Sequence, residues 1–264
     1  TECNGNAMLK NKPKQLGSMI GLLLMMSLTA CHEESSTQQQ TQDASAPSQA
    51  QSKQQDLPLI QAKTQPIVLP KVEVCESDEC TAYQLATVKT NVDWIDDFFL
   101  KRLKKDLPLA FNPPASEPTA SQVAHITQSS NTYTVRYLGQ NANMASFVIE
   151  SETYNQGAAH GMYHKEYVIF DLKTKKRIMV DDLLQTQVQQ KLINALYEAN
   201  QNWLTQHQVS KDKLEITDNF YFGVHGIVFV YPLYELAPYS DGMTELTLPY
   251  SQAKGLIRSE YLPK

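Results

Sequence analysis

The side chains with the most obvious chemical potential lie in and just after residues 154–161. His160 and His164 are four residues apart, and on a helix this spacing would let both imidazoles face one zinc ion, as in the HExxH motif. No glutamate follows His160, however, and the surrounding tyrosine, valine and isoleucine residues favour a strand. Four strand residues span roughly 13 Å, too far for one ion. We therefore predict no metal site here. We expect His160 to hydrogen-bond locally, where Gly157 and Gly161 let the backbone pack closely.

Other reactive patterns are missing from the sequence. It contains no Gly-x-Ser-x-Gly nucleophile elbow and no glycine-rich phosphate loop. Asp181 and Asp182 are explained by the start of a helix, where negative charge is favourable. The net charge of -5 argues against a nucleic-acid partner, which would require a basic face. We predict no catalytic residue and no cofactor. A small periplasmic hydrolase or metal-binding protein that uses His160 remains the alternative.

Tyrosine is unusually abundant, with 13 residues, many of them in or beside predicted loops. Its side chain combines a large apolar ring with a polar tip, which suits contacts with proteins or sugars. The tyrosines that flank the predicted Gly- and Pro-containing connections are Tyr154, Tyr163, Tyr231, Tyr234, Tyr239 and Tyr250. Of these we single out Tyr154, Tyr234 and Tyr239. The competing explanation is that most tyrosines occupy half-buried strand positions with their hydroxyls in water.

The N-terminus has the features of a bacterial lipoprotein. Three lysines between residues 10 and 14 precede an apolar run at residues 16–28, which is shorter than the about 20 residues of a membrane span. The run ends in Leu28-Thr29-Ala30-Cys31, which resembles a lipobox. We predict a signal peptide at residues 1–30, with Met8 as a plausible true start, and a lipid anchor on Cys31. Because His32 rather than aspartate follows Cys31, the resemblance implies the outer membrane, facing the periplasm.

Two further cysteines, Cys75 and Cys80, are separated by four residues, which does not match the CxxC spacing of redox or zinc sites. In an oxidising compartment we predict a local disulfide that closes the acidic loop 76–79. Such a short loop contributes roughly 2 kcal/mol on the chain-entropy model. A metal site is the weaker interpretation, because two thiols fill only half of a zinc coordination shell.

The pattern along the chain predicts an α+β protein preceded by a tether. Residues 31–70 are rich in Gln, Ser, Thr and Pro and have too few apolar groups to offset the entropy of ordering. Order is expected to begin near Lys71, in a small N-terminal region at residues 71–140 and a second domain at residues 141–264. Helices should pack on one face of an antiparallel sheet. Apolar periodicity predicts helices at residues 94–103 and 181–203, and strands at residues 83–88, 133–137, 147–153, 163–170, 177–180, 220–222, 227–230 and 243–248.

The motifs of the second half resemble a known family. They are Tyr154-x-x-Gly157-x-Ala159-His160-Gly161, Phe170-Asp171-Leu172-Lys173-Thr174, Asp181-Asp182-Leu183-Leu184, Gly226-Ile227-Val228-Phe229, Tyr234-Glu235-Leu236-Ala237-Pro238-Tyr239-Ser240-Asp241-Gly242 and Leu248-Pro249-Tyr250-Ser251. In this order they resemble the RsiV-like family of extracytoplasmic domains (domain of unknown function 3298), over about residues 145–255. The candidate binding or motif residues are therefore Tyr154, Gly157, His160, Gly161, Tyr234, Tyr239 and Asp241.

The resemblance implies a binding role on the envelope side. One member of that family is a membrane anti-sigma factor whose outer domain binds lysozyme, and another carries the domain ahead of a polysaccharide deacetylase. We expect neither a sigma-binding nor a deacetylase domain here, since none precedes the apolar segment and the sequence ends at Lys264. The leading hypothesis is a non-enzymatic lipoprotein that binds a lysozyme-like protein or a cell-wall glycan such as peptidoglycan. A structural lipoprotein without a ligand is the third hypothesis.

Overall fold

The computed structural model describes residues 57–76, 79–115 and 127–263. The predicted signal peptide, Cys31 and the first part of the predicted tether therefore lie outside the described residues. Gln54–Lys264 forms one compact unit. In the described part of the chain, every helix is too short or too polar to cross a membrane.

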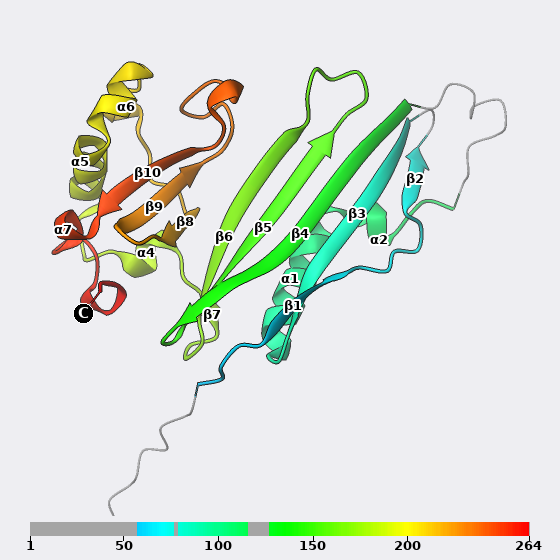
Figure 1. Ribbon diagram of the computed structural model, residues 1–264, viewed down its shortest axis with the longest axis horizontal. Coiled ribbons are helices and arrows are strands. Elements are labelled where there is room, and N and C mark those ends of the chain that lie inside the picture. Colours follow the sequence, from blue (N-terminus) through cyan, green and yellow to red (C-terminus); the bar gives the residue numbers. More distant parts are fainter. Residues whose placement is uncertain (1–56, 77–78, 116–126, 264) are drawn as a thin grey trace, which may run out of the picture. The chain divides into compact units, whose positions relative to one another are not determined.

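The larger of two sheets contains seven strands, arranged in the order β1-β3-β4-β5-β6-β7 with β2 pairing with β3 (Figure 1). All pairs are antiparallel except β3 with β4, which is parallel. The β4–β5–β6 meander follows from alternating apolar residues and tight connections. The strands are β1 (Ala62–Pro66), β2 (Glu73–Glu76), β3 (Glu79–Thr90), β4 (Thr127–Asn141), β5 (Met144–Tyr154), β6 (Met162–Asp171) and β7 (Lys176–Arg177).

One face of this sheet is covered by helix α1 (Asp93–Asp106), which is followed by the short α2 (Pro108–Phe111). The apolar residues of α1 recur at helical spacing, so Ile95, Phe99 and Leu103 point to the same side and are buried. The Phe99 ring packs against Phe147 and Phe170 of the sheet, with ring centroids 5.1 and 5.8 Å away. These contacts form the first hydrophobic core.

The second sheet has three strands, β8 (Phe220–Phe222), β9 (Gly226–Tyr231) and β10 (Thr244–Pro249), in the order β10-β9-β8. It lies between α5 (Gln189–Ala199) and strand β6 (Figure 1). The second core joins this sheet to the remaining helices, which are α4 (Val180–Leu183), α6 (Gln201–Gln206) and α7 (Tyr250–Ala253). Short 3-10 turns complete the unit, η1 (Lys211–Lys213), η2 (Tyr239–Asp241) and η3 (Ser259–Tyr261).

Strand β6 separates the two cores. Val168 and Phe170 belong to the first core and Ile169 to the second, because successive strand residues point to opposite faces. All three side chains are buried. The end of β6 is therefore hydrophobic on both faces, unlike a strand with one face in water.

The outer edge of β6 is bonded by the side chain of Asn219, just before β8. Its Oδ1 accepts the Tyr167 amide proton at 2.8 Å, and its Nδ2 donates to the Lys165 carbonyl oxygen at 2.8 Å. One amide side chain thus supplies the acceptor and donor that a neighbouring strand would otherwise provide. Asn219 is only 8% exposed, so it joins the two sheets at a largely dry contact.

The predicted α+β class and largely antiparallel sheet are confirmed, and so is the disulfide between Cys75 and Cys80. The start of order near Lys71 is wrong. Strand β1 already pairs with β3, and Ile60 is buried in the first core. The predicted tether therefore does not extend to residue 70, because a few apolar residues among polar ones suffice for an edge strand.

The domain boundary expected at residue 140 falls within the β4–β5 hairpin, whose strands share 11 paired positions. The change of core lies instead near residue 170.

The helix predicted over residues 181–203 is divided into α4, α5 and α6. Leu184 forms an isolated bridge to Ile257, and Gln187 has a positive φ of 59° that a helix excludes. Between α5 and α6, the Asn200 side chain donates a hydrogen bond to the Thr247 carbonyl oxygen of β10 at 3.0 Å.

Replacing Asn219 with alanine tests the bond between the sheets. The variant leaves the Tyr167 N–H and the Lys165 carbonyl of β6 without their partner, so we expect the free energy of unfolding to fall by about 1–3 kcal/mol. Urea denaturation measures this change. Asn202→Ala, at an exposed position of α6, is the matched control and should change stability by less than about 0.5 kcal/mol. Equal stability of both variants would contradict a structural role for Asn219.

Candidate functional site

Two loops distant in sequence meet at the same end of the two sheets (Figure 1). One connects β5 to β6 at residues 155–161, and the other connects β9 to β10 at residues 232–243. The Tyr239 hydroxyl donates to the Gly161 carbonyl oxygen at 3.0 Å, and the Lys165 amide lies 3.2 Å from the Met243 sulfur. These contacts bring the predicted motif residues of the β5–β6 loop next to those of the β9–β10 loop.

His160 is at the centre of this contact. Its ring stacks on Tyr239 with centroids 3.7 Å apart and an interplanar angle of 22°. Nδ1 lies 3.0 Å from the Gly161 carbonyl oxygen, and Nε2 lies 3.1 Å from the Tyr234 hydroxyl. Because Nδ1 faces an acceptor, it is the ring nitrogen that donates, and in that tautomer Nε2 accepts the Tyr234 proton. The local hydrogen bond predicted for His160 is present.

We call His160, Tyr163, Tyr234 and Tyr239 the aromatic cluster. The Tyr163 and Tyr234 rings lie 6.2 and 5.8 Å from that of Tyr239. Tyr234 is 54% exposed and has a φ of 68°, a left-handed conformation that costs a non-glycine residue energy. Its contact with His160 helps to hold that conformation. The cluster therefore presents an exposed aromatic side chain in a fixed position.

The two glycines of the first loop have different roles. A Cβ on Gly161 would lie 3.0 Å from Glu152 Oε1 and 3.3 Å from the Thr153 carbonyl, so the prediction of close packing holds there. At Gly157 it is wrong, because a Cβ would meet nothing within 4 Å. That residue instead has a φ of +87°, which favours glycine. Tyr154 lies at the end of β5, paired with Ser130, outside the aromatic cluster.

Asp241 anchors the second loop to the end of α6. Its Oδ2 lies 2.7 Å from His207 Nε2, and His207 Nδ1 lies 2.8 Å from the Trp203 carbonyl oxygen. Only the imidazolium can donate to both acceptors. The bond to the Trp203 carbonyl, followed by that to Asp241, raises the pKa of His207, and the bond from His207 lowers the pKa of Asp241. The His207 ring also stacks on Trp203 at 3.9 Å.

His164 has surroundings unlike those of His160. It lies in β6, half-buried, and burial lowers its pKa.

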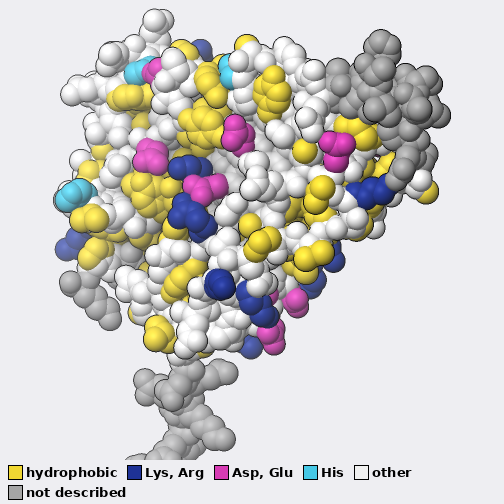
Figure 2. All heavy atoms as spheres, turned by 45° about the vertical axis from the view of Figure 1, so that its right-hand side comes forward, with side chains coloured by type: hydrophobic (Ala, Val, Ile, Leu, Met, Phe, Trp, Pro, Cys, Tyr) yellow, Lys and Arg dark blue, Asp and Glu magenta, His cyan; other side chains and the backbone are white. Residues whose placement is uncertain are grey.

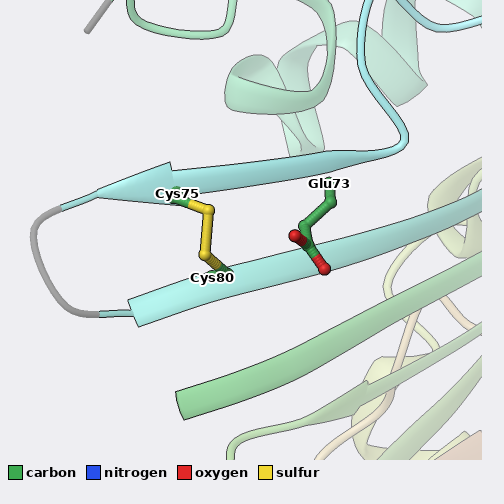
Figure 3. A group of neighbouring side chains, drawn as sticks. All are labelled: Glu73, Cys75 and Cys80. Atoms are coloured by element: carbon green, nitrogen blue, oxygen red, sulfur yellow. A yellow bond between two sulfur atoms is a disulfide. The ribbon is translucent and has the colours of Figure 1, made fainter. Parts of the chain in front are cut away.

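Among the residues that the structure describes, one group of potential ligands is close enough to hold a metal ion, and it contains neither His160 nor His164. That group is Glu73, Cys75 and Cys80 (Figure 3). The two cysteines form the disulfide between paired positions of β2 and β3, so their thiolates are not available to an ion.

Sequence reasoning named Tyr163 among the tyrosines that flank the loops but did not single it out, and it missed His207 and Asn219 as parts of this region. Tyr163 alternates like an ordinary strand residue, and His207 follows a helix that was expected for its apolar face alone. Asn219 lies between predicted elements. Their roles depend on contacts with residues 34 to 76 positions away, such as Asp241 and Tyr239. No local sequence signal encodes such contacts.

The fold is a two-sheet α+β architecture shared with solved structures. One is a DUF3298 family protein from Pseudomonas aeruginosa PAO1, with 20% sequence identity and a TM-score of 0.57, covering 79% of this chain and 97% of that chain. Another is a member of the same family from Bacteroides fragilis NCTC 9343, with 15% identity and a TM-score of 0.52, covering 76% of this chain and 94% of that chain. No curated protein matches the chain.

The chain carries a DUF3298 domain. Residues 169–251 match the family model described as "Protein of unknown function (DUF3298)". The match begins at Ile169, which belongs to the second core, and includes Tyr234, Tyr239 and Asp241. It stops short of the β5–β6 loop, so the aromatic cluster joins the matched domain to the strands before it.

The His207–Asp241 pair predicts a pH-dependent stability. The contribution of His207 is complete below its ordinary pKa of 6.5 and is lost as pH rises through its raised value. That of Asp241 is complete above its ordinary 3.8 and is lost as pH falls through its lowered value. We expect Asp241→Asn to lower the thermal midpoint of unfolding most between pH 3.8 and pH 6.5, and less at about pH 9. Melting curves over this pH range measure the difference, and a pH-independent difference would contradict the charged pair.

Proposed function

We propose that the protein is a non-enzymatic binding protein of the bacterial cell envelope that contacts its partner through the aromatic cluster. The observation that carries this proposal is the exposed Tyr234 ring, held by His160 in an otherwise unfavourable backbone conformation. Rigid aromatic side chains lose little conformational entropy on binding, and they dominate the energetics of many interfaces.

The environment of His160 supports binding over acid–base chemistry. Both of its ring nitrogens have partners within the protein, and its face is stacked on Tyr239. A general base needs a ring nitrogen directed at the substrate proton. In this arrangement His160 orients Tyr234 and Tyr239 instead.

The proposed partner is a lysozyme-like protein or a cell-wall glycan such as peptidoglycan. The resemblance of the motifs to the RsiV-like family supports this choice, as does the position of those motifs in the aromatic cluster. On the face shown in Figure 2, acidic and basic side chains lie next to one another. Together with the net charge of -5, this distribution offers little attraction to nucleic acid.

We propose that a lipid on Cys31 anchors the protein in the outer membrane, facing the periplasm. The lipobox-like sequence before Cys31 supports the anchor. The disulfide between Cys75 and Cys80 fits an oxidising compartment. The residues between Cys31 and β1 would then separate the aromatic cluster from the membrane.

Replacing Tyr234 with alanine tests the binding surface. Loss of a central aromatic contact typically costs at least about 2 kcal/mol, so we expect affinity for the partner to fall by roughly 30-fold. Sedimentation with peptidoglycan and a binding assay with purified lysozyme provide the measurement. Val224→Ala is the control, because Val224 is an 89% exposed apolar residue in the β8–β9 connection. Unchanged binding of Tyr234→Ala, with its fold intact, would refute this surface.

A further inference from the structure

A hollow of about 330 Å³ lies on the large sheet beside the aromatic cluster. Strand register explains six of its eight lining residues, and the other two are the paired Ser151 and His164. Two rows cross strands β4, β5 and β6, and alternate residues on a strand share a face. The rows are Thr132–Glu152–Tyr163 and Thr134–Glu150–Lys165.

The charges of the hollow are nearly balanced. Glu150 accepts a hydrogen bond from Arg136 Nε at 2.7 Å, and Lys165 Nζ lies 3.5 Å from its other oxygen. The bond from Arg136 lowers the pKa of Glu150. Within the lining, Glu150 and Glu152 carry negative charge and Lys165 carries positive charge, while Arg136 offsets Glu150 from outside the lining. Such a lining favours an uncharged polar ligand over a polyanion or polycation.

Glu152 is the acceptor that remains available. It is exposed, and in the described part of the chain no ion pair or hydrogen bond engages its carboxylate. One of its oxygens lies 3.0 Å from the point where a Cβ on Gly161 would be. The carboxylate is therefore adjacent to the loop that carries His160. A charged acceptor forms strong hydrogen bonds to hydroxyl and amide donors.

Tyr163 belongs to both the hollow and the aromatic cluster. A Cβ on residue 242 would lie 2.8 Å from the Tyr163 hydroxyl oxygen. The β9–β10 loop can therefore approach Tyr163 this closely because residue 242 is a glycine. The side chain is 36% exposed. An apolar ring beside an unpaired carboxylate is suited to a ligand with an apolar C–H face and hydroxyl groups at its edge.

The size of the hollow suits a small ligand. About 330 Å³ is near the lower end of small-ligand sites, which span about 300–1,000 Å³. The hollow therefore has room for one small cyclic polyol.

We propose that this hollow seats an uncharged sugar of a glycan strand, with Tyr163 against the sugar ring and Glu152 accepting its hydroxyl or amide protons. This inference rests on the proposed binding function and gives its ligand class as a neutral saccharide. Tyr234 and Tyr239, farther along the aromatic cluster, contact the neighbouring sugars of the strand.

Titration of the complete chain with a tetramer of β-1,4-linked N-acetylglucosamine tests the proposal. We expect measurable binding, and we expect Glu152→Gln to weaken it about tenfold, because a neutral amide replaces a charged acceptor of nearly the same shape. Tyr163→Ala should weaken binding at least as much. Glu198→Gln, at an exposed position of α5, is the matched control and should bind like the wild type.

A parallel assay with purified lysozyme and with peptidoglycan separates the two proposals. If the tetramer fails to bind, or binds Glu152→Gln as well as wild type, the saccharide inference is overturned. If Tyr234→Ala still weakens lysozyme binding in that case, the proposed binding function stands without it. If no variant changes binding to any of the three probes, both proposals fail. Thermal midpoints near that of wild type verify that Glu152→Gln and Tyr163→Ala are folded.

Discussion

Burial of the end of strand β6 on both faces is the constraint on which the rest of the structure depends. Val168 and Phe170 contact the core beneath α1, while Ile169 contacts the core of the second sheet. Burying apolar surface is worth roughly 25 cal/mol per Å², so both cores stabilise the same strand. The free edge of β6 would still leave backbone groups unpaired, and Asn219 supplies their partners. Apolar packing and the Asn219 side chain thus both help to hold the two sheets together.

The binding surface is a consequence of that arrangement. The loop before β6 and the loop before β10 are more than 70 residues apart, and they meet because β6 lies beside the second sheet. Tyr239 and His160 then stack, and Tyr234 is held in a left-handed conformation. At the far side of the second loop, Asp241 is bonded to the end of α6. Each tyrosine that we assign to binding therefore has a support outside its own loop.

Local features of this structure were accessible from sequence, and contacts between distant segments were not. Alternation and helical spacing predict β4 to β6 and α1, since these patterns act over a few residues. The same reasoning extended the tether over β1, because an edge strand with mixed composition looks like a polar linker. His160 could be recognised as a locally bonded residue. Its partner Tyr234, the clamp by Asn219 and the bond of His207 to Asp241 depend on the packing of the two sheets.

The central claim is that the two loops form one binding surface continuous with the hollow on the large sheet. Mapping of amide chemical shifts in the presence of peptidoglycan-derived oligosaccharide tests it most directly. The account predicts that the perturbed amides gather at residues 160–165 and 234–243 and at Glu152, with the β8–β9 connection around Val224 unchanged. Perturbations confined to other surfaces, such as the β4–β5 hairpin near Leu138, would contradict it.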